Sequence, residues 1–253
     1  MKYQQQNFQY FNLDKYDTLN GFDFGKVEGW FKDELTKEFA HFKFGQYTID
    51  FDVEEGDIVF DFGASIGPFV WQIKEKNPSK VFCIEPSWGL LDTLDKNLKA
   101  TKIPYKIFKC GVGKESGAEE LVAFDYKGNP LVTSFPTLSF MDIIKESGVD
   151  KIDFLKTDSE GGEYNIFNNE NIWWIKENVK KISGEFHLES REDKKRFDVF
   201  RNTYLRLFPN HKIYSIDMFD ITNYLWEEKV PGRMEDKSFL EYYNQIIIHI
   251  DNR

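Results

Sequence analysis

The sequence has little cysteine, no long apolar run and no excess of positive charge. Two cysteines, Cys83 and Cys110, in 253 residues cannot form a disulfide framework, so a reducing, cytoplasmic location is the default. No apolar stretch approaches the roughly 18 residues that a membrane-spanning helix needs, so we expect no membrane partner. The net charge of −10 repels phosphate backbones, and we therefore expect no nucleic-acid partner.

What is present is typical of one large globular domain. Hydrophobic residues make up 41% of the chain and aromatic residues 17%, which excludes a disordered chain. Residues 56–253 alternate between strand and helix patterns. Residues 1–55 do not, and we expect an N-terminal cap there, with a helix near 29–39 and a strand near 46–52. The oligomeric state is left open.

The alternation over residues 56–253 predicts a doubly wound α/β fold with five parallel strands and two terminal strands. No helix separates the last strand from the C-terminus, so that strand is free to insert antiparallel. Residues 114–136 are less regular and predict only a short strand at 121–124. The main strands are expected at 58–62, 80–85, 105–110, 152–157, 181–187, 212–218 and 245–250, and the helices at 67–76, 88–100, 140–146, from 163, and 192–208.

The first strand ends in an acidic, glycine-bearing loop, Asp61-Phe-Gly63-Ala64-Ser65-Ile-Gly67. Its glycines allow a ligand to approach the backbone, and the helix that follows offers free amides. The spacing is not the Gly-x-Gly-x-x-Gly of dinucleotide enzymes, which disfavours a nicotinamide-dependent oxidoreductase. The alternative is an ordinary tight turn between strand and helix.

Glu85 ends the second strand, 22 positions after Gly63. An acid at this place can accept hydrogen bonds from both ribose hydroxyls of a nucleoside. The alternative is a carboxylate that merely precedes a helix, next to Pro86. The glycine loop and the acid together favour a nucleoside ligand.

Two further strands end in ionisable residues, Asp158 with Glu160 and Glu185 with His187. Asp158 could hold a cationic ligand, or it and Glu160 could cap the next helix. His187 could serve as a general base for a hydroxyl, as a metal ligand with Asp158, or as a hydrogen-bonded histidine at the strand end.

Three further segments continue this pattern: Gly111-Val112-Gly113, Lys156-Thr-Asp158-Ser-Glu160-Gly-Gly-Glu163 and Gly184-Glu185-Phe-His187. Together with the segments above, they resemble the FkbM-type S-adenosylmethionine-dependent methyltransferases over roughly residues 55–190. Two departures are Ser65, where the family usually has asparagine, and Thr137-Leu138-Ser139-Phe140, where it usually has Thr-Leu-Asp-Asp. The resemblance implies a class I methyltransferase fold, a Rossmann-like seven-stranded sheet with an antiparallel last strand. It implies S-adenosylmethionine bound by the loop from Asp61 to Gly67, with Glu85 on the ribose.

The resulting hypothesis is an S-adenosylmethionine-dependent O-methyltransferase that acts on a hydroxyl of a sugar, glycan or small molecule. His187 is the first candidate for the base and Asp158 the second; no metal is required. The alternative is a non-catalytic nucleoside-binding module with the same fold. The expected cofactor contacts are Asp61, Gly63, Ala64, Ser65, Gly67, Glu85, Pro86, Gly111, Val112 and Asp158.

Overall fold

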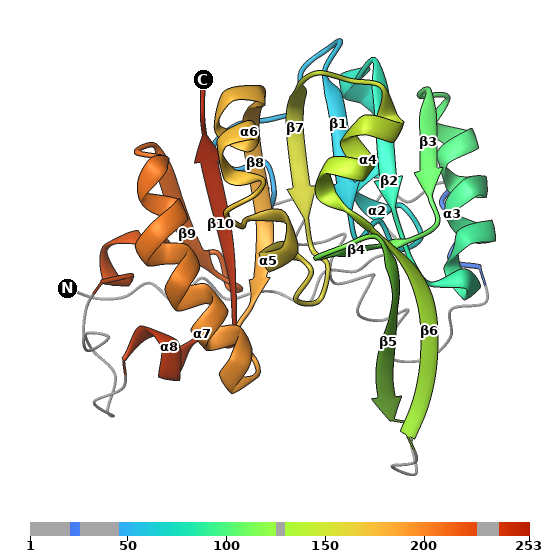
Figure 1. Ribbon diagram of the computed structural model, residues 1–253. Coiled ribbons are helices and arrows are strands. Elements are labelled where there is room, and N and C mark those ends of the chain that lie inside the picture. The colour runs from blue at the N-terminus through green and yellow to red at the C-terminus, as the bar shows by residue number, and fades with distance from the viewer. Residues whose placement is uncertain (1–20, 26–45, 125–129, 227–237) are drawn as a thin grey trace.

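A seven-stranded sheet organises the molecule in the computed structural model, which describes residues 21–25, 46–124, 130–226 and 238–253 (Figure 1). Its strand order is β3-β2-β1-β7-β8-β10-β9, and the first five strands run parallel. β10 pairs antiparallel with both neighbours, as predicted for the last strand. The bounds are β1 Ile58–Phe62, β2 Lys80–Ile84, β3 Tyr105–Phe108, β7 Ile152–Thr157, β8 Val179–His187, β9 His211–Ser215 and β10 Gln245–Asp251.

Helices cover both faces of this sheet, so its central strands are buried on both sides. Successive residues of β1 show the two layers: Val59 joins the apolar cluster with α2 and α3, whereas Phe60 joins the cluster with α4 to α7. The bounds are α2 Pro68–Gln72, η3 Lys74–Lys76, α3 Trp88–Thr101, α4 Phe140–Ser147, α5 Glu163–Ile166, α6 Ile172–Asn178, α7 Arg191–Val199, η4 Phe200–Tyr204, η5 Leu205–Leu207, η6 Thr222–Tyr224 and α8 Phe239–Tyr242.

The helical segment predicted over 192–208 is present without a break, but it is not α-helical throughout. α7 is α-helical, the next five residues form a π-helical segment, and the last turn is a 3₁₀ helix. Within the described part of the chain, no helix is both long enough and apolar enough to cross a membrane.

A second sheet was not expected from the sequence. β4 Gly111–Gly113, β6 Pro130–Ser139 and β5 Gly117–Phe124 lie side by side in the order β4-β6-β5. β5 and β6 form a long hairpin that projects from the carboxyl ends of the parallel strands (Figure 1). The hairpin replaces the single short strand predicted at 121–124.

The strand predicted at 46–52 is wrong. The backbone of residues 46–50 is a series of turns and bends and pairs with none of the described strands. The segment lies against a face of the sheet, where Phe51 contacts Phe154 on β7 and His249 on β10. Tyr47 and Phe51 are nevertheless buried, with their rings against Phe69 and Phe154. The helix predicted near 29–39 lies outside the described residues, and the division at residue 55 stays a prediction.

Candidate functional site

A cavity of about 700 Å³ opens at the carboxyl ends of β1, β2 and β7. Its volume falls within the roughly 300–1,000 Å³ that is usual for small-molecule sites. Seven of the residues predicted for the site line it: Gly63, Ser65, Glu85, Pro86, Gly111, Val112 and Asp158. Gly63 therefore meets residues 22 to 95 positions further along the chain in one cavity, because parallel strands end at the same edge of a sheet.

The loop after β1 packs closely against the end of β7. Gly63 has a φ of 79°, and a Cβ atom there would lie 1.7 Å from the main-chain oxygen of Asp158. Only glycine fits at this position, because any side chain would collide with the main chain after β7. This steric reason is independent of the approach of a ligand. Ser65 also has a positive φ, 50°, a region that asparagine tolerates better than serine. Its Oγ is buried and has no hydrogen-bond partner among the described residues.

Glu85 ties two loops together at the cavity wall. Its Oε2 accepts a hydrogen bond from the amide of Ser65 at 2.8 Å, and its Oε1 accepts one from the amide of Ser87 at 2.7 Å. Each carboxylate oxygen can accept a second bond. Glu85 can therefore hold a ribose and the glycine loop at the same time.

Three residues predicted as cofactor contacts do not line the cavity: Asp61, Ala64 and Gly67. Asp61 is fully buried behind the loop, where Lys156 Nζ lies 3.0 Å from Oδ1. Burial raises the pKa of Asp61 to about 6, although the Lys156 ammonium opposes this rise. Lys156 Nζ also donates to the main-chain oxygen of Gly63 at 2.9 Å, so this pair supports the loop from behind.

Asp158 follows β7 and faces the cavity, with its side chain 26% exposed. Tyr47 donates its hydroxyl to Asp158 Oδ2 at 3.1 Å. Lys156 Nζ lies 3.9 Å from the same oxygen. Asp158 is thus an oriented carboxylate between the cofactor loop and the end of β8.

His187, the last residue of β8, is buried among carboxylates. Its Nδ1 lies 3.1 Å from Glu163 Oε1, which also accepts the main-chain amide of His187 at 2.8 Å. Its Nε2 lies 3.4 Å from Glu160 and 3.9 Å from Asp158. Burial alone would lower the pKa of His187, but the hydrogen bond to Glu163 and the surrounding carboxylates raise it to about 10. A protonated imidazole has no lone pair to accept a proton, so this environment opposes the general-base role predicted for His187.

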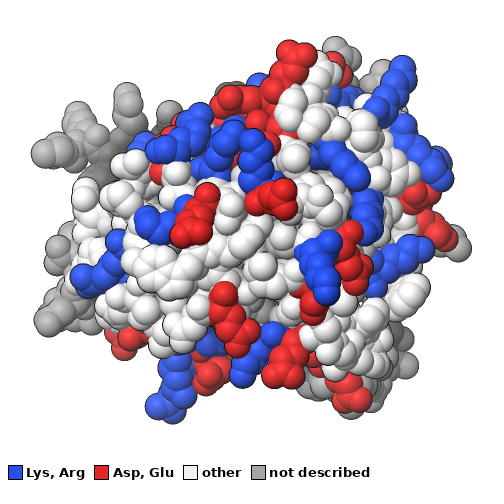
Figure 2. All heavy atoms as spheres, turned by 45° about the horizontal axis from the view of Figure 1, so that its top comes forward, with Lys and Arg blue, Asp and Glu red and all other residues white. Residues whose placement is uncertain are grey.

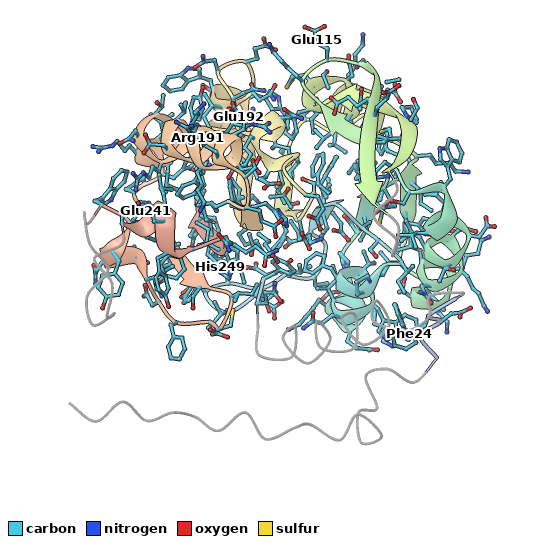
Figure 3. All side chains as sticks on the ribbon, turned by 90° about the horizontal axis from the view of Figure 1, so that it is seen from below. Phe24, Glu115, Arg191, Glu192, Glu241 and His249 are labelled. Carbon is cyan, nitrogen blue, oxygen red and sulfur yellow. The ribbon has the colours of Figure 1, made fainter. Side chains whose placement is uncertain are left out.

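The sequence did not single out several residues that build the site. Tyr47 and Glu163 orient Asp158 and His187, and Lys156 was part of a quoted motif without an assigned role. Trp88, 59% exposed at the start of α3, also lines the cavity. The remaining wall comes from the β5–β6 hairpin and from α7, with Glu119, Glu120, Phe135, Asp193 and Arg196. Figure 3, which looks onto this edge, shows the hairpin and the start of α7, marked by Arg191 and Glu192, on the same side of the sheet.

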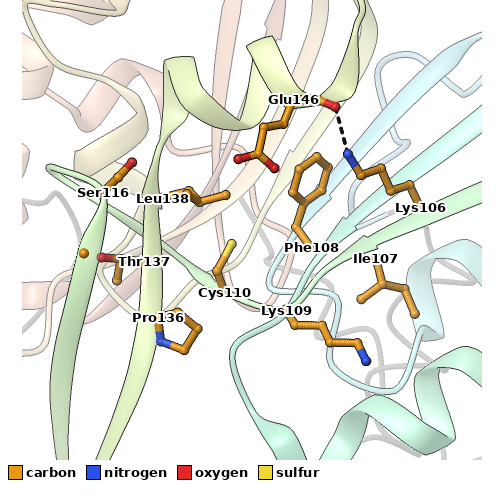
Figure 4. A pocket seen from close by; sticks show the side chains of 11 residues that line it. Lys106, Ile107, Phe108, Lys109, Cys110, Ser116, Pro136, Thr137, Leu138 and Glu146 are labelled. Carbon is orange, nitrogen blue, oxygen red and sulfur yellow. Dashed lines mark hydrogen bonds between the residues drawn. The ribbon is translucent and has the colours of Figure 1, made fainter.

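A second cavity of about 590 Å³ lies beside β3 and α4 (Figure 4). Lys106 donates across its rim to the main-chain oxygen of Glu146 at 2.8 Å. Burial raises the pKa of the Cys110 thiol in its wall to about 11, which keeps this cysteine protonated and unreactive. None of the predicted site residues lines this cavity.

The cavity of about 700 Å³ has the polar contacts and the apolar wall that an adenosyl ligand needs. The unpartnered Ser65 Oγ and the second acceptor positions of Glu85 offer polar contacts. Ile84, Pro86 and Trp88 add an apolar wall beside them. These residues would hold the nucleoside, and Asp158 lies where it can face the sulfonium end.

Three comparisons with known proteins bear on this site. The methyltransferase FkbM domain matches residues 61–216. The tRNA (guanine(37)-N(1))-methyltransferase Trm5b of Methanocaldococcus jannaschii is 29% identical over 103 residues, 38% of this chain and 28% of that protein's length. Among solved structures, fibrillarin of Aeropyrum pernix with bound S-adenosyl-L-methionine is 8% identical, with a TM-score of 0.46. The match covers 82% of this chain and 74% of the fibrillarin chain. The METTL16 methyltransferase domain has 10% identity and a TM-score of 0.46, covering 86% and 83%.

The expectation that nucleic acid is excluded as a partner is wrong, because the Methanocaldococcus relative is a tRNA methyltransferase. A net charge of −10 is a property of the whole chain, whereas substrate binding depends on local charge. Figure 2 shows Lys and Arg interspersed with Asp and Glu on the face that it presents. With the FkbM match spanning more than half of the chain, the protein belongs to the methyltransferase FkbM domain family.

Proposed function

We propose that this methyltransferase acts on a hydroxyl oxygen, carried by a sugar or another small molecule. The observation that carries the proposal is the Asp158 carboxylate, which faces the cavity beside the Gly63 loop and is oriented by Tyr47. A hydroxyl acceptor must lose its proton as it is methylated, and a carboxylate at this place can receive it.

Bound S-adenosylmethionine supplies an activated methyl group on a sulfonium sulfur. Glu85 holds the ribose, and the Gly63–Gly67 loop, supported by the Asp61–Lys156 pair, shapes the cofactor side of the cavity. Asp158 holds the acceptor hydroxyl and takes its proton. The β5–β6 hairpin and α7 enclose the acceptor side, so that positioning supplies most of the rate enhancement.

In this proposal Asp158 replaces His187 as the base. The His187 imidazole, whose pKa the surrounding carboxylates raise, instead lies among these acidic side chains, with its Nε2 3.9 Å from Asp158 Oδ1. The proposed cofactor contacts are the residues that line the cavity, with Asp61, Ala64 and Gly67 as the residues that support them.

The test is the release of S-adenosylhomocysteine with panels of hydroxylated sugars and small molecules. We expect Asp158→Asn to lower turnover about 10²–10⁴-fold while leaving the affinity for S-adenosylhomocysteine nearly intact. Full turnover in this variant would remove Asp158 from the mechanism.

A second candidate is an RNA acceptor, and the similarity to a tRNA methyltransferase favours it. Incubation with unmodified tRNA and methyl-labelled cofactor distinguishes the two. Label incorporated into RNA, with none transferred to the hydroxylated panel, would favour this second candidate over the first.

A further inference from the structure

Three side chains with metal-ligating atoms converge beside the cavity; Asp158 and Glu160 line it, and His187 lies behind them. Asp158 and Glu160 come from the loop between β7 and α5, and His187 comes from the end of β8. One ligating atom from each lies within 4.8 Å of the other two. Nothing in the methyl transfer proposed above needs Glu160, whose side chain is 83% exposed and lines the cavity.

The ring of His187 is held so that Nε2 points at this cluster. Glu163, fully buried, fixes Nδ1 at 3.1 Å and the main-chain amide at 2.8 Å. Nε2 makes no hydrogen bond in the part of the chain that the structure describes, and the side chain is only 5% exposed. Metal-binding histidines are oriented in this way, with a carboxylate on the ring nitrogen that does not bind the metal.

The spacing is close to that of ligands around one ion. Adjacent ligands at about 2.1 Å from an octahedral ion lie roughly 3 Å apart. Nε2 is 3.4 Å from Glu160 Oε2 and 3.9 Å from Asp158 Oδ1. Rotation of the exposed Glu160 side chain can shorten the first distance, and a small movement of Asp158 the second. One imidazole and two carboxylates suit Mn²⁺ or a similar divalent cation. Because Asp158 and Glu160 line the cavity, an ion held by them would be within reach of a ligand bound there.

We propose that Asp158, Glu160 and His187 bind a divalent cation, which takes the acceptor hydroxyl as a further ligand. This inference rests on the proposed hydroxyl methylation: the cation would activate the same hydroxyl whose proton Asp158 takes. A hydroxyl on a divalent cation loses its proton more readily, because the cation stabilises the developing oxyanion. In the binding step the cation displaces the Nε2 proton of His187 to solvent.

Mn²⁺ titration of the metal-stripped protein, followed by electron paramagnetic resonance of free Mn²⁺, tests the site directly. We expect one site per chain, and an affinity lower by about tenfold or more in Glu160→Gln and in His187→Asn. Glu160→Gln changes an exposed side chain, so folding is not at risk. The matched control is Glu192→Gln, an exposed carboxylate on α7 that pairs with Lys195, and it should bind Mn²⁺ as the wild type does.

Absence of a stoichiometric site, or unchanged affinity in both cluster variants, overturns the inference. Calorimetry with S-adenosylhomocysteine is run on the same samples. If S-adenosylhomocysteine binds but Mn²⁺ does not, only the proposed cation site is wrong. If the wild-type protein does not bind S-adenosylhomocysteine, the proposed function itself is contradicted.

Discussion

At the scale of single residues, Glu85 has a structural task in addition to the ribose contact predicted for it. It was predicted as a ribose ligand, and the structure shows that it also holds the amides of Ser65 and Ser87. An acid at the end of β2 thus shapes the cofactor site before any ligand arrives.

Replacing Glu85 with alanine should lower the affinity for S-adenosylhomocysteine by at least about tenfold. Hydrogen bonds to a charged group contribute about 1.5–3 kcal/mol each, and the two amides lose their acceptor as well. Calorimetry measures the affinity. Glu75→Ala, which removes an exposed carboxylate from η3, is the control and should change nothing. Unchanged affinity in folded Glu85→Ala would contradict the ribose assignment.

The steric role of Gly63 can be tested against Gly56, which has nearly the same φ but has open space where a Cβ atom would lie. Their φ values are 79° and 85°, but no heavy atom lies within 4 Å of a Cβ built at Gly56. We expect Gly56→Ala to cost about 1–2 kcal/mol of stability for its left-handed backbone. Gly63→Ala should cost clearly more and abolish cofactor binding, since its Cβ meets the Asp158 main chain. Equal losses in denaturant melts would show that close packing at Gly63 does not matter.

At the scale of elements, residues 46–52 lie against a face of the sheet without forming a strand. Asp50 accepts hydrogen bonds from the Tyr214 hydroxyl at 2.8 and 3.0 Å and pairs with Lys212 on β9. His249 Nδ1 on β10 lies 3.2 Å from the same carboxylate. This one side chain therefore joins three segments distant in sequence.

Asp50 should make the stability depend on pH in the acid range. Burial would raise its pKa, but hydrogen bonds from His249, Lys212 and Tyr214 outweigh this and hold the pKa below its usual value. A lowered folded-state pKa stabilises the protein above the unfolded value of about 3.9, and this contribution disappears as the pH falls through the folded-state pKa. Thermal melts of Asp50→Asn should lose less stability than the wild type as the pH falls below about 4. Parallel curves would exclude Asp50 as a source of acid sensitivity.

At the scale of the whole molecule, the cavity gathers residues from the ends of several strands, from the hairpin and from α7, between Phe62 and Arg196. A ligand that binds only the folded protein stabilises it, by about 2.7 kcal/mol at a concentration 100 times its Kd. S-adenosylhomocysteine should therefore raise the melting temperature, and NAD should not. A shift with NAD alone would contradict the cofactor assignment.

The sequence by itself determined that five strands run parallel, and it predicted at which of their ends a ligand would bind. The signals are local: apolar runs near Ile58 and Ile152 that stop at acid and glycine, and helices between them. Since the carboxyl ends of parallel strands share an edge, Glu85 and Asp158 could be placed together without coordinates. The antiparallel last strand followed from the lack of a helix after it.

The tertiary structure alone decided which of these residues face the cavity and in what charge state. Asp61 turned toward Lys156 because a buried carboxylate needs a cation, and that cation lies almost a hundred residues away. The pKa of His187 is raised because the segment 158–163 brings three carboxylates to the end of β8, and a pKa depends on neighbours in space. The β5–β6 hairpin and the turns at 46–50 escaped prediction for the same reason: pairing with a partner strand, or the lack of one, overrides a weak alternating pattern.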